Sequence, residues 1–437
     1  MEWYWAAAVL IGSIIVLMVL GVPVALAFMA TNMIGTLVFV GGVAGMMQVV
    51  DNATALITTF QLVPVPLFIL MGSLFFYSGL AVRVFDALDK LFGRLPGRLC
   101  YLTVAGGATF STMTGSSMAN TAMLGSLMVP EMQRRGYNWR MSLGPILGTG
   151  GLAMIIPPSN LGVLLASVAS IDVGRLLVSG VIPGFLLALL YTGMIFLQVR
   201  LNPKSAPTYD VERTTARQKF MAVAVDVLPM SIVVFMVIGT IIFGIATPSE
   251  ASAFGVLGVL ILATAYRLLT WEAIVKSLES TIKVGGMVFF IIINSSVFSQ
   301  LVAYSGASSG LLGWATSFDL STTAMLLCMF AVLLLLGMFM DPVSMILISV
   351  PIFLPIVGFL KVDLVWFGLF TLLALEMSQT TPPFGLLLYI MLGVAPKGTT
   401  LFQVAGAAFP FLICDAILVT LLMLFPAIAL YLPNLMR

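Results

Sequence analysis

Long apolar runs, most of them close to 20 residues, alternate with short polar segments along the 437-residue chain. A run of about 20 apolar residues can cross the hydrocarbon core of a bilayer as a helix. The pattern therefore predicts an all-α polytopic membrane protein. In the first half the predicted spans lie near 4–20, 22–42, 62–80, 139–171 and 175–200. In the second half they lie near 223–244, 248–268, 284–304, 364–396 and 400–431.

Two further apolar segments, 101–131 and 322–357, carry polar residues near their middle and predict a re-entrant pair of short helices each. The spans 139–171 and 364–396 are broken as well, each by a Pro-Pro pair and the polar or glycine residues before it. Inside a membrane, such interruptions persist only where protein or a water-filled cavity satisfies the freed backbone groups. We therefore expect the functional residues at these hairpin tips and breaks.

Composition narrows the class of protein. Apolar residues make up 61% of the chain and charged residues only 8%, whereas about a quarter of the residues of a soluble domain are charged. The chain has no histidine, which removes the usual general base of intramembrane proteolysis and acyl transfer. The three cysteines are widely separated and suggest neither a disulfide framework nor a metal cluster. The first residues lack the positive region of a cleaved signal peptide, so the first apolar run is interpreted as a retained span.

The second half repeats features of the first at a separation of 225 positions. The prolines Pro23, Pro130, Pro157 and Pro158 find counterparts at Pro248, Pro355, Pro382 and Pro383, and the separation drifts to 227 for Pro183 and Pro410. We predict two repeats, 1–200 and 221–437, joined by a polar cytoplasmic linker at 201–220. Since each repeat is predicted to cross the membrane five times, the second is inverted relative to the first.

The distribution of basic residues gives an independent test of this topology. With the N-terminus outside, every Lys and Arg except Arg175, Lys361 and Arg437 falls on the inner side, as the positive-inside rule requires. Both termini are therefore predicted to be periplasmic. The stretch 82–98 is amphipathic and is predicted to lie on the cytoplasmic interface, with a counterpart near 270–283; a plain surface loop is the alternative.

The predicted tips and breaks suggest ion-binding cages. Backbone carbonyls freed by a broken helix can surround an alkali cation without burying a charge, and half-helix ends present dipoles to ions. The tip at 111–117 would pair with the break at 150–158, and the tip at 337–342 with the break at 376–383. For a lone Ser-Ser or Pro-Pro, helix packing or a kink is the alternative.

Acidic residues at membrane depth are costly and usually functional. Asp341, at the second tip, is the first candidate, and Glu376, just before the second break, is the next. Either could instead cap a helix N-terminus. Glu250, in the sequence Thr-Pro-Ser-Glu, is predicted to cap the start of a span. Asp226 and Asp415 have no assigned role.

Five motifs resemble the large membrane subunit (M, DctM-like) of TRAP transporters, the tripartite ATP-independent periplasmic family. They are FILMGSLFFYSG at 68–79, TGSS at 114–117, PEMQRRGY at 130–137, IPPS at 156–159 and TPPFG at 381–385. The resemblance covers nearly the whole chain. It implies an elevator-type, sodium-coupled importer of organic acid anions in a bacterial inner membrane. It also implies two partners, a small four-helix membrane subunit and a periplasmic substrate-binding protein.

The resemblance also implies site residues. Two sodium sites are expected, one at Ser111, Thr114, Ala153, Ile156 and Pro158, and one at Gly337, Ser378, Thr381 and Phe384. The substrate is expected between the two tips, near Ser116, Ser117, Asn160 and Asp341. Ala153 and Ser378 each stand where the family commonly has glycine. At Ala153 the change is harmless if only the carbonyl binds, whereas at Ser378 it leaves the geometry of the second site less well defined.

The resemblance further implies a division of labour. The hairpins and broken spans (101–171 and 322–396) would form a mobile transport domain, and the spans in 4–80 and 223–304 a scaffold. C4-dicarboxylates, sialic acid, 2-oxo acids and other carboxylates are open as substrates. A stand-alone ion-coupled carboxylate carrier is one alternative. An intramembrane hydrolase using Ser116 or Ser117 is a more distant one, because every lysine that could replace the missing histidine base lies near a membrane surface.

Overall fold

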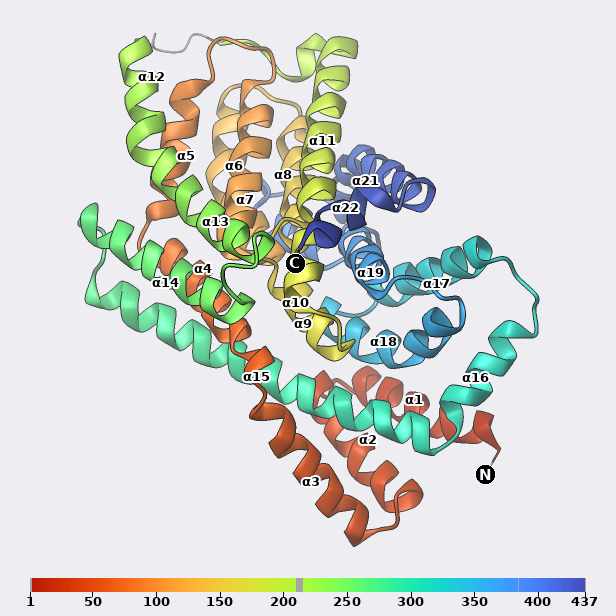
Figure 1. Ribbon diagram of the computed structural model, residues 1–437. Coiled ribbons are helices and arrows are strands. Elements are labelled where there is room, and N and C mark those ends of the chain that lie inside the picture. Colours follow the sequence, from red (N-terminus) through yellow and green to blue (C-terminus); the bar gives the residue numbers. More distant parts are fainter. Residues whose placement is uncertain (1, 210–214, 384, 437) are drawn as a thin grey trace.

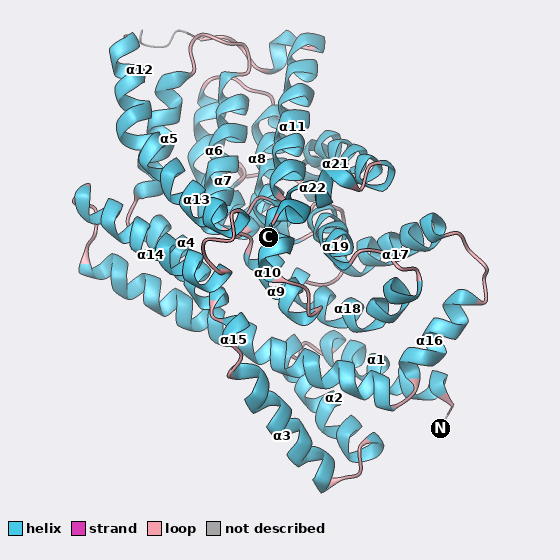
Figure 2. Cartoon of the chain, in the orientation of Figure 1, coloured by secondary structure: helices cyan, strands magenta, loops and turns pink. Residues whose placement is uncertain are grey.

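The computed structural model describes residues 2–209, 215–383 and 385–436, and within these ranges the regular structure is helical throughout (Figures 1 and 2). The helices of the first half are α1 (Trp3–Val19), α2 (Val24–Phe39), α3 (Val43–Ile57), α4 (Pro64–Tyr77), α5 (Leu80–Leu91), α6 (Arg98–Thr114), α7 (Ser117–Arg134), α8 (Trp139–Ile155), α9 (Asn160–Val168), α10 (Val173–Ser179) and α11 (Val181–Leu201). The predicted all-α class is confirmed.

The helices of the second half are α12 (Ala216–Ala222), α13 (Leu228–Ile242), α14 (Pro248–Ala265), α15 (Trp271–Tyr304), α16 (Ala307–Thr316), α17 (Thr322–Gly337), α18 (Pro342–Phe359), α19 (Leu364–Gln379), α20 (Leu386–Val394), α21 (Leu401–Leu424) and α22 (Ala427–Leu435). A π-helical segment, Val223–Val227, joins α12 to α13. The start of α14 shows the predicted cap, because Thr247 and Glu250 exchange side-chain and backbone hydrogen bonds.

The same order of elements occurs in both halves. A helical hairpin (α6–α7 or α17–α18) precedes a helix, a cis Pro-Pro peptide and a short helix (α8–α9 or α19–α20). Each of these four segments is thus two helices with an interruption between them, and α8 and α9 are bent by 43° at theirs. The re-entrant course of the two hairpins stays a prediction. The inverted orientation of the two halves stays a prediction.

Several helices differ from the sequence expectation. Helix α15 runs unbroken for 34 residues, so the predicted interfacial stretch near 270–283 is the first part of one long helix. Helix α3, amphipathic and protruding beside α2 in Figure 1, was not expected from the apolar runs. The stretch 82–98 is not a plain loop, because most of it lies in α5, which buries Val84 and Leu88.

Length and composition allow six helices to cross a membrane, or up to eight if each bent pair is one span. The sequence predicts ten crossings. The difference arises because the predicted spans α1, α2 and α19 are apolar but shorter than 18 residues, whereas α18, which the sequence assigns to the second hairpin, is one of the six. The chain is therefore a multi-pass membrane protein by its helices, and the count of ten stays a prediction.

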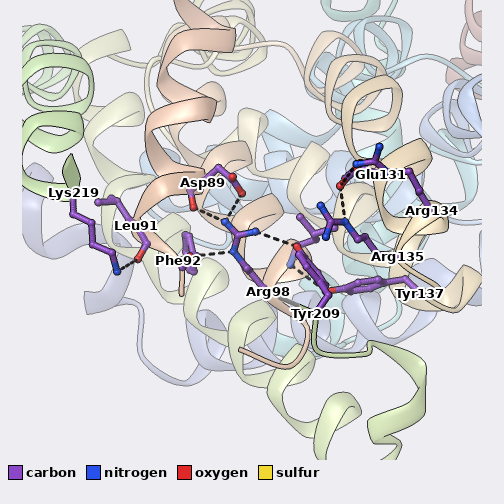
Figure 3. Close-up of polar contacts among 11 residues, drawn as sticks. Asp89, Leu91, Phe92, Arg98, Glu131, Arg134, Arg135, Tyr137, Tyr209 and Lys219 are labelled. Atoms are coloured by element: carbon purple, nitrogen blue, oxygen red, sulfur yellow. Dashed lines mark hydrogen bonds and ion pairs between the residues drawn. The ribbon is translucent and has the colours of Figure 1, made fainter. Parts of the chain in front are cut away.

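The segment after α11 is held against the first hairpin by a polar cluster (Figure 3). Arg98, at the start of α6, is 4% exposed. It donates hydrogen bonds to the carbonyls of Asp89 (2.7 Å) and Phe92 (3.1 Å) and to the hydroxyl of Tyr209 (3.1 Å). The guanidinium of Arg135, at the end of α7, stacks 4.0 Å from the Tyr209 ring. The linker thus bridges both legs of the hairpin.

A second polar contact ties α5 to the start of the second half. Asp226, which the sequence left without a role, forms an ion pair with Arg83 at 2.5 Å. Arg83 also lies 4.1 Å from the centre of the Tyr266 ring. Asp226 therefore has a structural partner and is not part of a tip or break.

Candidate functional site

The first hairpin tip lies directly against the first break, as the sequence predicts. Gly115 ends α6 with a φ of +57°, a conformation that favours glycine. A Cβ atom there would come within 2.7 Å of the Pro158 carbonyl oxygen. Asn160 closes the contact, because its backbone N–H donates to Gly115 O and its side-chain amide to Thr114 O, both at 3.4 Å.

The hydroxyls predicted for the first sodium site are buried and turned toward their own helix. Ser111 Oγ donates to Gly107 O at 2.7 Å, and Thr114 Oγ1 donates to Phe110 O at 2.9 Å. A hydroxyl oxygen that donates still has two lone pairs to accept with, and in Ser111 one of them accepts from the Asn120 amide. Ala153, Ile156 and Pro158 are buried too, and the contact at Gly115 brings the carbonyl oxygen of Pro158 to the tip.

Asn120 is an additional residue that the sequence did not single out. From α7 it donates its side-chain amide to Ser111 Oγ (3.0 Å), Thr149 O (3.2 Å) and Gly107 O (3.3 Å), so it links three elements of the cage. No local sequence motif marked it. Its spacing of three residues from Ser117 on α7, which places both on one face, was the available signal.

Three buried oxygens near this cage lack hydrogen-bond partners: Asn120 Oδ1, Ser117 Oγ and Thr121 Oγ1. A buried polar atom without a partner costs about 1–3 kcal/mol, so such oxygens indicate a place for water or a cation. An all-oxygen, uncharged donor set suits a hard cation rather than a soft metal. In the described part of the chain, no group of three or more His, Cys, Asp or Glu residues could hold a metal.

The second tip and break are also in contact. A Cβ atom at Gly337, the last residue of α17, would overlap the side chain of Ser378 in α19. Ser378 Oγ donates to Leu375 O at 2.8 Å, and Thr381 Oγ1 donates to Met377 O at 2.6 Å. Three of the residues predicted for the second sodium site therefore lie at one end of α19 or beside it. The fourth, Phe384, lies outside the described residues.

The four predicted substrate residues fall into two groups. Ser116 caps α7 by accepting from Ala119 N (3.4 Å), and Ser117 and Asn160 lie beside it at the first tip and break. Asp341 belongs to the second tip. Its carboxylate accepts from the backbone N–H groups of Val343 (3.1 Å) and Ser344 (3.2 Å) and from the Ser344 hydroxyl. Asp341 therefore caps α18, the alternative role left open by the sequence.

The two acidic residues Glu376 and Asp415 share a tyrosine. Tyr191 Oη lies 3.1 Å from Glu376 Oε1 and 2.5 Å from Asp415 Oδ1, and all three side chains are buried. The sequence singled out Glu376, gave Asp415 no role and did not consider Tyr191. The one available signal was the repeat register, since Tyr191 and Asp415 are 224 positions apart.

Helix α4, which carries the 68–79 motif, supports the first tip from the other side. A Cβ atom at Gly72 would lie 2.9 Å from the carbonyl oxygens of both Met113 and Thr114. Glycine at this position therefore lets α4 approach the backbone of the tip closely.

Comparison with known proteins agrees with this architecture. Residues 11–428 match the family model described as the tripartite ATP-independent periplasmic transporter, DctM component. The chain is 31% identical to the C4-dicarboxylate TRAP transporter large permease protein DctM of Rhodobacter capsulatus, over 99% of each chain. It is 27% identical to the ectoine TRAP transporter large permease protein TeaC of Halomonas elongata, over 98% of this chain and 99% of the relative.

Among solved structures, the YdaH transporter of Alcanivorax borkumensis is similar, with a TM-score of 0.61 and 14% sequence identity. The match covers 88% of this chain and 90% of YdaH. At this identity the likeness shows the fold alone. The family model and the R. capsulatus relative show more: the chain belongs to the DctM family, the large permease subunits of TRAP transporters.

Proposed function

We propose that this subunit carries out sodium-coupled secondary uptake of an organic acid anion across a bacterial inner membrane. The substrate would be delivered by a periplasmic binding protein, and a small four-helix membrane subunit would complete the permease. The contact between the first tip and the first break is the observation that carries the proposal. It unites an uncharged oxygen cage with two helix N-termini in one place.

The oxygen cage supports sodium as the coupling ion. Ser111 and Thr114 on α6, with the backbone of Ala153, Ile156 and Pro158, would hold one sodium ion. Gly337, Ser378 and Thr381, with Phe384, would hold a second. Neutral oxygens bind an alkali cation without placing a permanent charge in the membrane, and the partnerless Asn120 oxygen fits this chemistry.

Two helix N-termini support an anionic substrate. Helix α7 begins at Ser117 and α9 at Asn160, and the hydrogen bonds of Asn160 bring the two starts together. The N-terminus of a helix presents backbone N–H groups and a partial positive charge, which favours anions. Ser116, Ser117 and Asn160 would then supply the polar contacts, with Asp341 shaping the second tip.

The names of the relatives guide the choice of substrate. The R. capsulatus relative is named for C4-dicarboxylates and the H. elongata relative for ectoine. A permease protein named for isethionate, DctMQ of Oleidesulfovibrio alaskensis, is 28% identical over 89% of this chain and 60% of its own length. Because substrates vary among relatives this distant, we propose a C4-dicarboxylate first, with sialic acid and other carboxylates as further candidates.

We further propose an elevator movement, in which the hairpins and breaks move against the scaffold. Because Gly72 on α4 has no side chain, the scaffold lies directly against the backbone of the first tip, and no side chain at this position would obstruct the movement of the hairpin. Both termini would be periplasmic.

Proteoliposomes containing this chain, the small subunit and the binding protein loaded with a radiolabelled dicarboxylate test the proposal. Uptake should require an inward sodium gradient and should stop when potassium replaces sodium. Uptake of equal rate without sodium would contradict the coupling. Uptake by this chain without the binding protein would instead favour a stand-alone carboxylate carrier.

A further inference from the structure

A cavity of about 500 Å³ lies where the ends of three helices meet. The start of α8, the end of α11 and the first turns of α21 line it, and Figure 1 shows these helices side by side in the upper part of the molecule. Cavities of this size hold small organic ligands. The cavity is separate from the tips and breaks, because Arg140, which lines it, is about 22 Å along α8 from the break that follows Ile155.

The polar side chains around the cavity have unused hydrogen-bond donors. The guanidinium of Arg140 lies 5.1 Å from the centre of the Trp139 ring and makes no hydrogen bond or ion pair with the described residues. Asn138 uses its side-chain oxygen to accept from the Arg140 N–H at 3.3 Å, so its amide nitrogen still has two hydrogens to donate. The side-chain amides of Gln198 and Asn202 bond to none of the described residues either.

The charge around the cavity is positive. None of the described residues that line it is acidic. Arg200 precedes Leu201 in the chain and Lys204 precedes Ser205, and both basic side chains are exposed and form no ion pair with the described residues. Positive charge together with N–H donors fits a phosphate group, which is anionic and accepts hydrogen bonds.

The rest of the lining is apolar and faces outward. Leu201 at the end of α11 is 76% exposed, and Phe409 on α21 is 62% exposed. Exposed apolar side chains continue along both helices, with Phe196 on α11 and Ile413 and Ile417 on α21. In a membrane protein, such a continuous apolar face contacts acyl chains or another protein chain.

The backbone that carries the donors is fixed by its own hydrogen bonds. The N–H of Asn138 donates to Ser205 O at 2.9 Å, and Ser142 Oγ donates to Asn138 O at 3.1 Å. Ser205 Oγ donates in turn to Asn202 O at 2.6 Å. These bonds join the start of α8 to the segment after α11, so a ligand would meet a preformed site and would lose less affinity to ordering.

We propose that this cavity binds the headgroup of an anionic phospholipid. Arg140 and the three side-chain amides would bind the phosphate, and the acyl chains would lie along the exposed apolar faces of α11 and α21. The three helix ends are those that the basic residues place on the inner side of the membrane, and basic pockets between helices on that side suit anionic headgroups. A bound lipid would connect the three helices. The site goes beyond sodium-coupled uptake and does not depend on it.

Native mass spectrometry of the purified, delipidated full chain tests the site. The probes are phosphatidylglycerol, which is anionic, and phosphatidylcholine with the same acyl chains, which has no net charge. Wild type should bind phosphatidylglycerol about tenfold more tightly, because each basic residue near an anionic headgroup contributes a factor of about five. Inorganic phosphate should not displace the lipid, because it cannot use the apolar part of the site.

The variant Arg140→Gln removes the charge and keeps most of the side chain, so the preference for phosphatidylglycerol should fall about fivefold. Arg267→Gln is the matched control and should keep the preference. Arg267 is also exposed and also predicted to lie on the inner side, but it follows α14, which Figure 1 shows on the other side of the molecule from α21.

Gly406→Leu tests the same site without changing its charge. Gly406 lines the cavity on α21, and a Cβ atom there would make only ordinary contact with Trp139, at 3.6 Å. Leucine also favours a helix more than glycine does, so the variant should fold. Its longer side chain would occupy the cavity, and binding of phosphatidylglycerol should weaken.

Equal affinity of wild type for the two lipids would overturn the proposal, as would equal loss of the preference in Arg140→Gln and Arg267→Gln. Displacement of the lipid by inorganic phosphate would also overturn it and assign the cavity to a soluble anion. Release of the small membrane subunit by Arg140→Gln or Gly406→Leu, with lipid binding unchanged, would assign this surface to a protein partner instead.

Discussion

The two tip-and-break regions occupy corresponding places in the two halves but are closed by different groups. In the first, Gly115 turns the chain in a left-handed conformation, and neutral Asn120 and Asn160 make the bonds. In the second, the tip carries the charged cap Asp341, and Ser378 fills the space beside Gly337. Both regions hold buried oxygens without hydrogen-bond partners, on Ser117 and Asn120 in the first and on Glu376 and Gln379 in the second. The difference is that the first tip carries no charged side chain, whereas the second carries a carboxylate whose hydrogen bonds go to its own helix.

This difference suggests that one architecture supports two tasks. The first region has the groups to bind both an ion and an anion. The second region has the groups to bind an ion and to hold its own hairpin together.

The largest effect is expected for Gly115→Ala. The added methyl group would lie 2.7 Å from the Pro158 oxygen and would push the tip from the break. A displacement worth about 1.4 kcal/mol already changes an equilibrium tenfold, so sodium-driven uptake should fall about tenfold or more. Initial rates in proteoliposomes measure this.

Gly79→Ala is the control for Gly115→Ala. Gly79 has a similar left-handed φ of +80° but nothing within 4 Å of a built Cβ. Both variants share the conformational cost of about 1–2 kcal/mol, so the difference between them isolates the contact with the break. Equal loss of uptake in both would show that the contact at Pro158 is not needed.

Asn120→Leu should give the next largest effect. It removes hydrogen bonds to Ser111, Thr149 and Gly107 while keeping a similar volume. We expect a loss of about 1–3 kcal/mol of stability and about tenfold weaker half-saturation by sodium. Sodium titration of uptake rates measures the second quantity.

Gln379→Leu is the comparison variant in the second half, because it also removes a buried amide, whose nitrogen lies 3.9 Å from the sulfur of Met154. Its effect on the sodium dependence should be smaller. A larger effect for Gln379→Leu than for Asn120→Leu would reverse the assignment of the two regions.

Two variants of Asp341 distinguish its role as a helix cap from a requirement for its negative charge. Asparagine caps a helix about as well as aspartate, whereas alanine costs about 0.5–2 kcal/mol. We expect Asp341→Asn to keep uptake within about twofold and Asp341→Ala to impair it while the protein still folds. Rates normalised to folded protein decide this. If the asparagine variant were folded but inactive, the charge itself would be required.

The smallest effect is expected for Ser378→Ala. The hydroxyl bonds to Leu375 O of its own helix, so its loss should change stability by about 1 kcal/mol or less. Sodium dependence should stay the same if only the carbonyl of residue 378 binds the ion. A clear weakening of sodium activation would show that the hydroxyl itself is a ligand.

Local sequence rules predicted the parts of the fold that depend on local chemistry. Polar residues within apolar runs marked both hairpins, the Pro-Pro pairs marked both breaks, and Thr247 with Glu250 marked a helix start. These features follow from backbone hydrogen bonding and proline sterics, which act within a few residues. The contact between tip and break followed from the repeat register.

Other features depend on packing between distant segments. The unbroken course of α15 is not visible in local hydropathy, because its charged first turns resemble an interfacial helix. The residues next to Tyr191 in the sequence do not distinguish it, and it stands out only because its hydroxyl contacts both Glu376 and Asp415. The role of Asn120 likewise follows only from its hydrogen bonds to Ser111 and Thr149, which lie on other helices.

The central proposal, that the tips and breaks bind sodium, is tested most directly by the melting temperature of the purified chain at constant ionic strength. Binding to the folded state stabilises by about 2.7 kcal/mol when the ligand is at 100 times its Kd. The melting temperature should therefore rise when sodium replaces potassium, and should rise much less in Asn120→Leu. Equal melting temperatures of the wild type in sodium and in potassium would contradict the proposal.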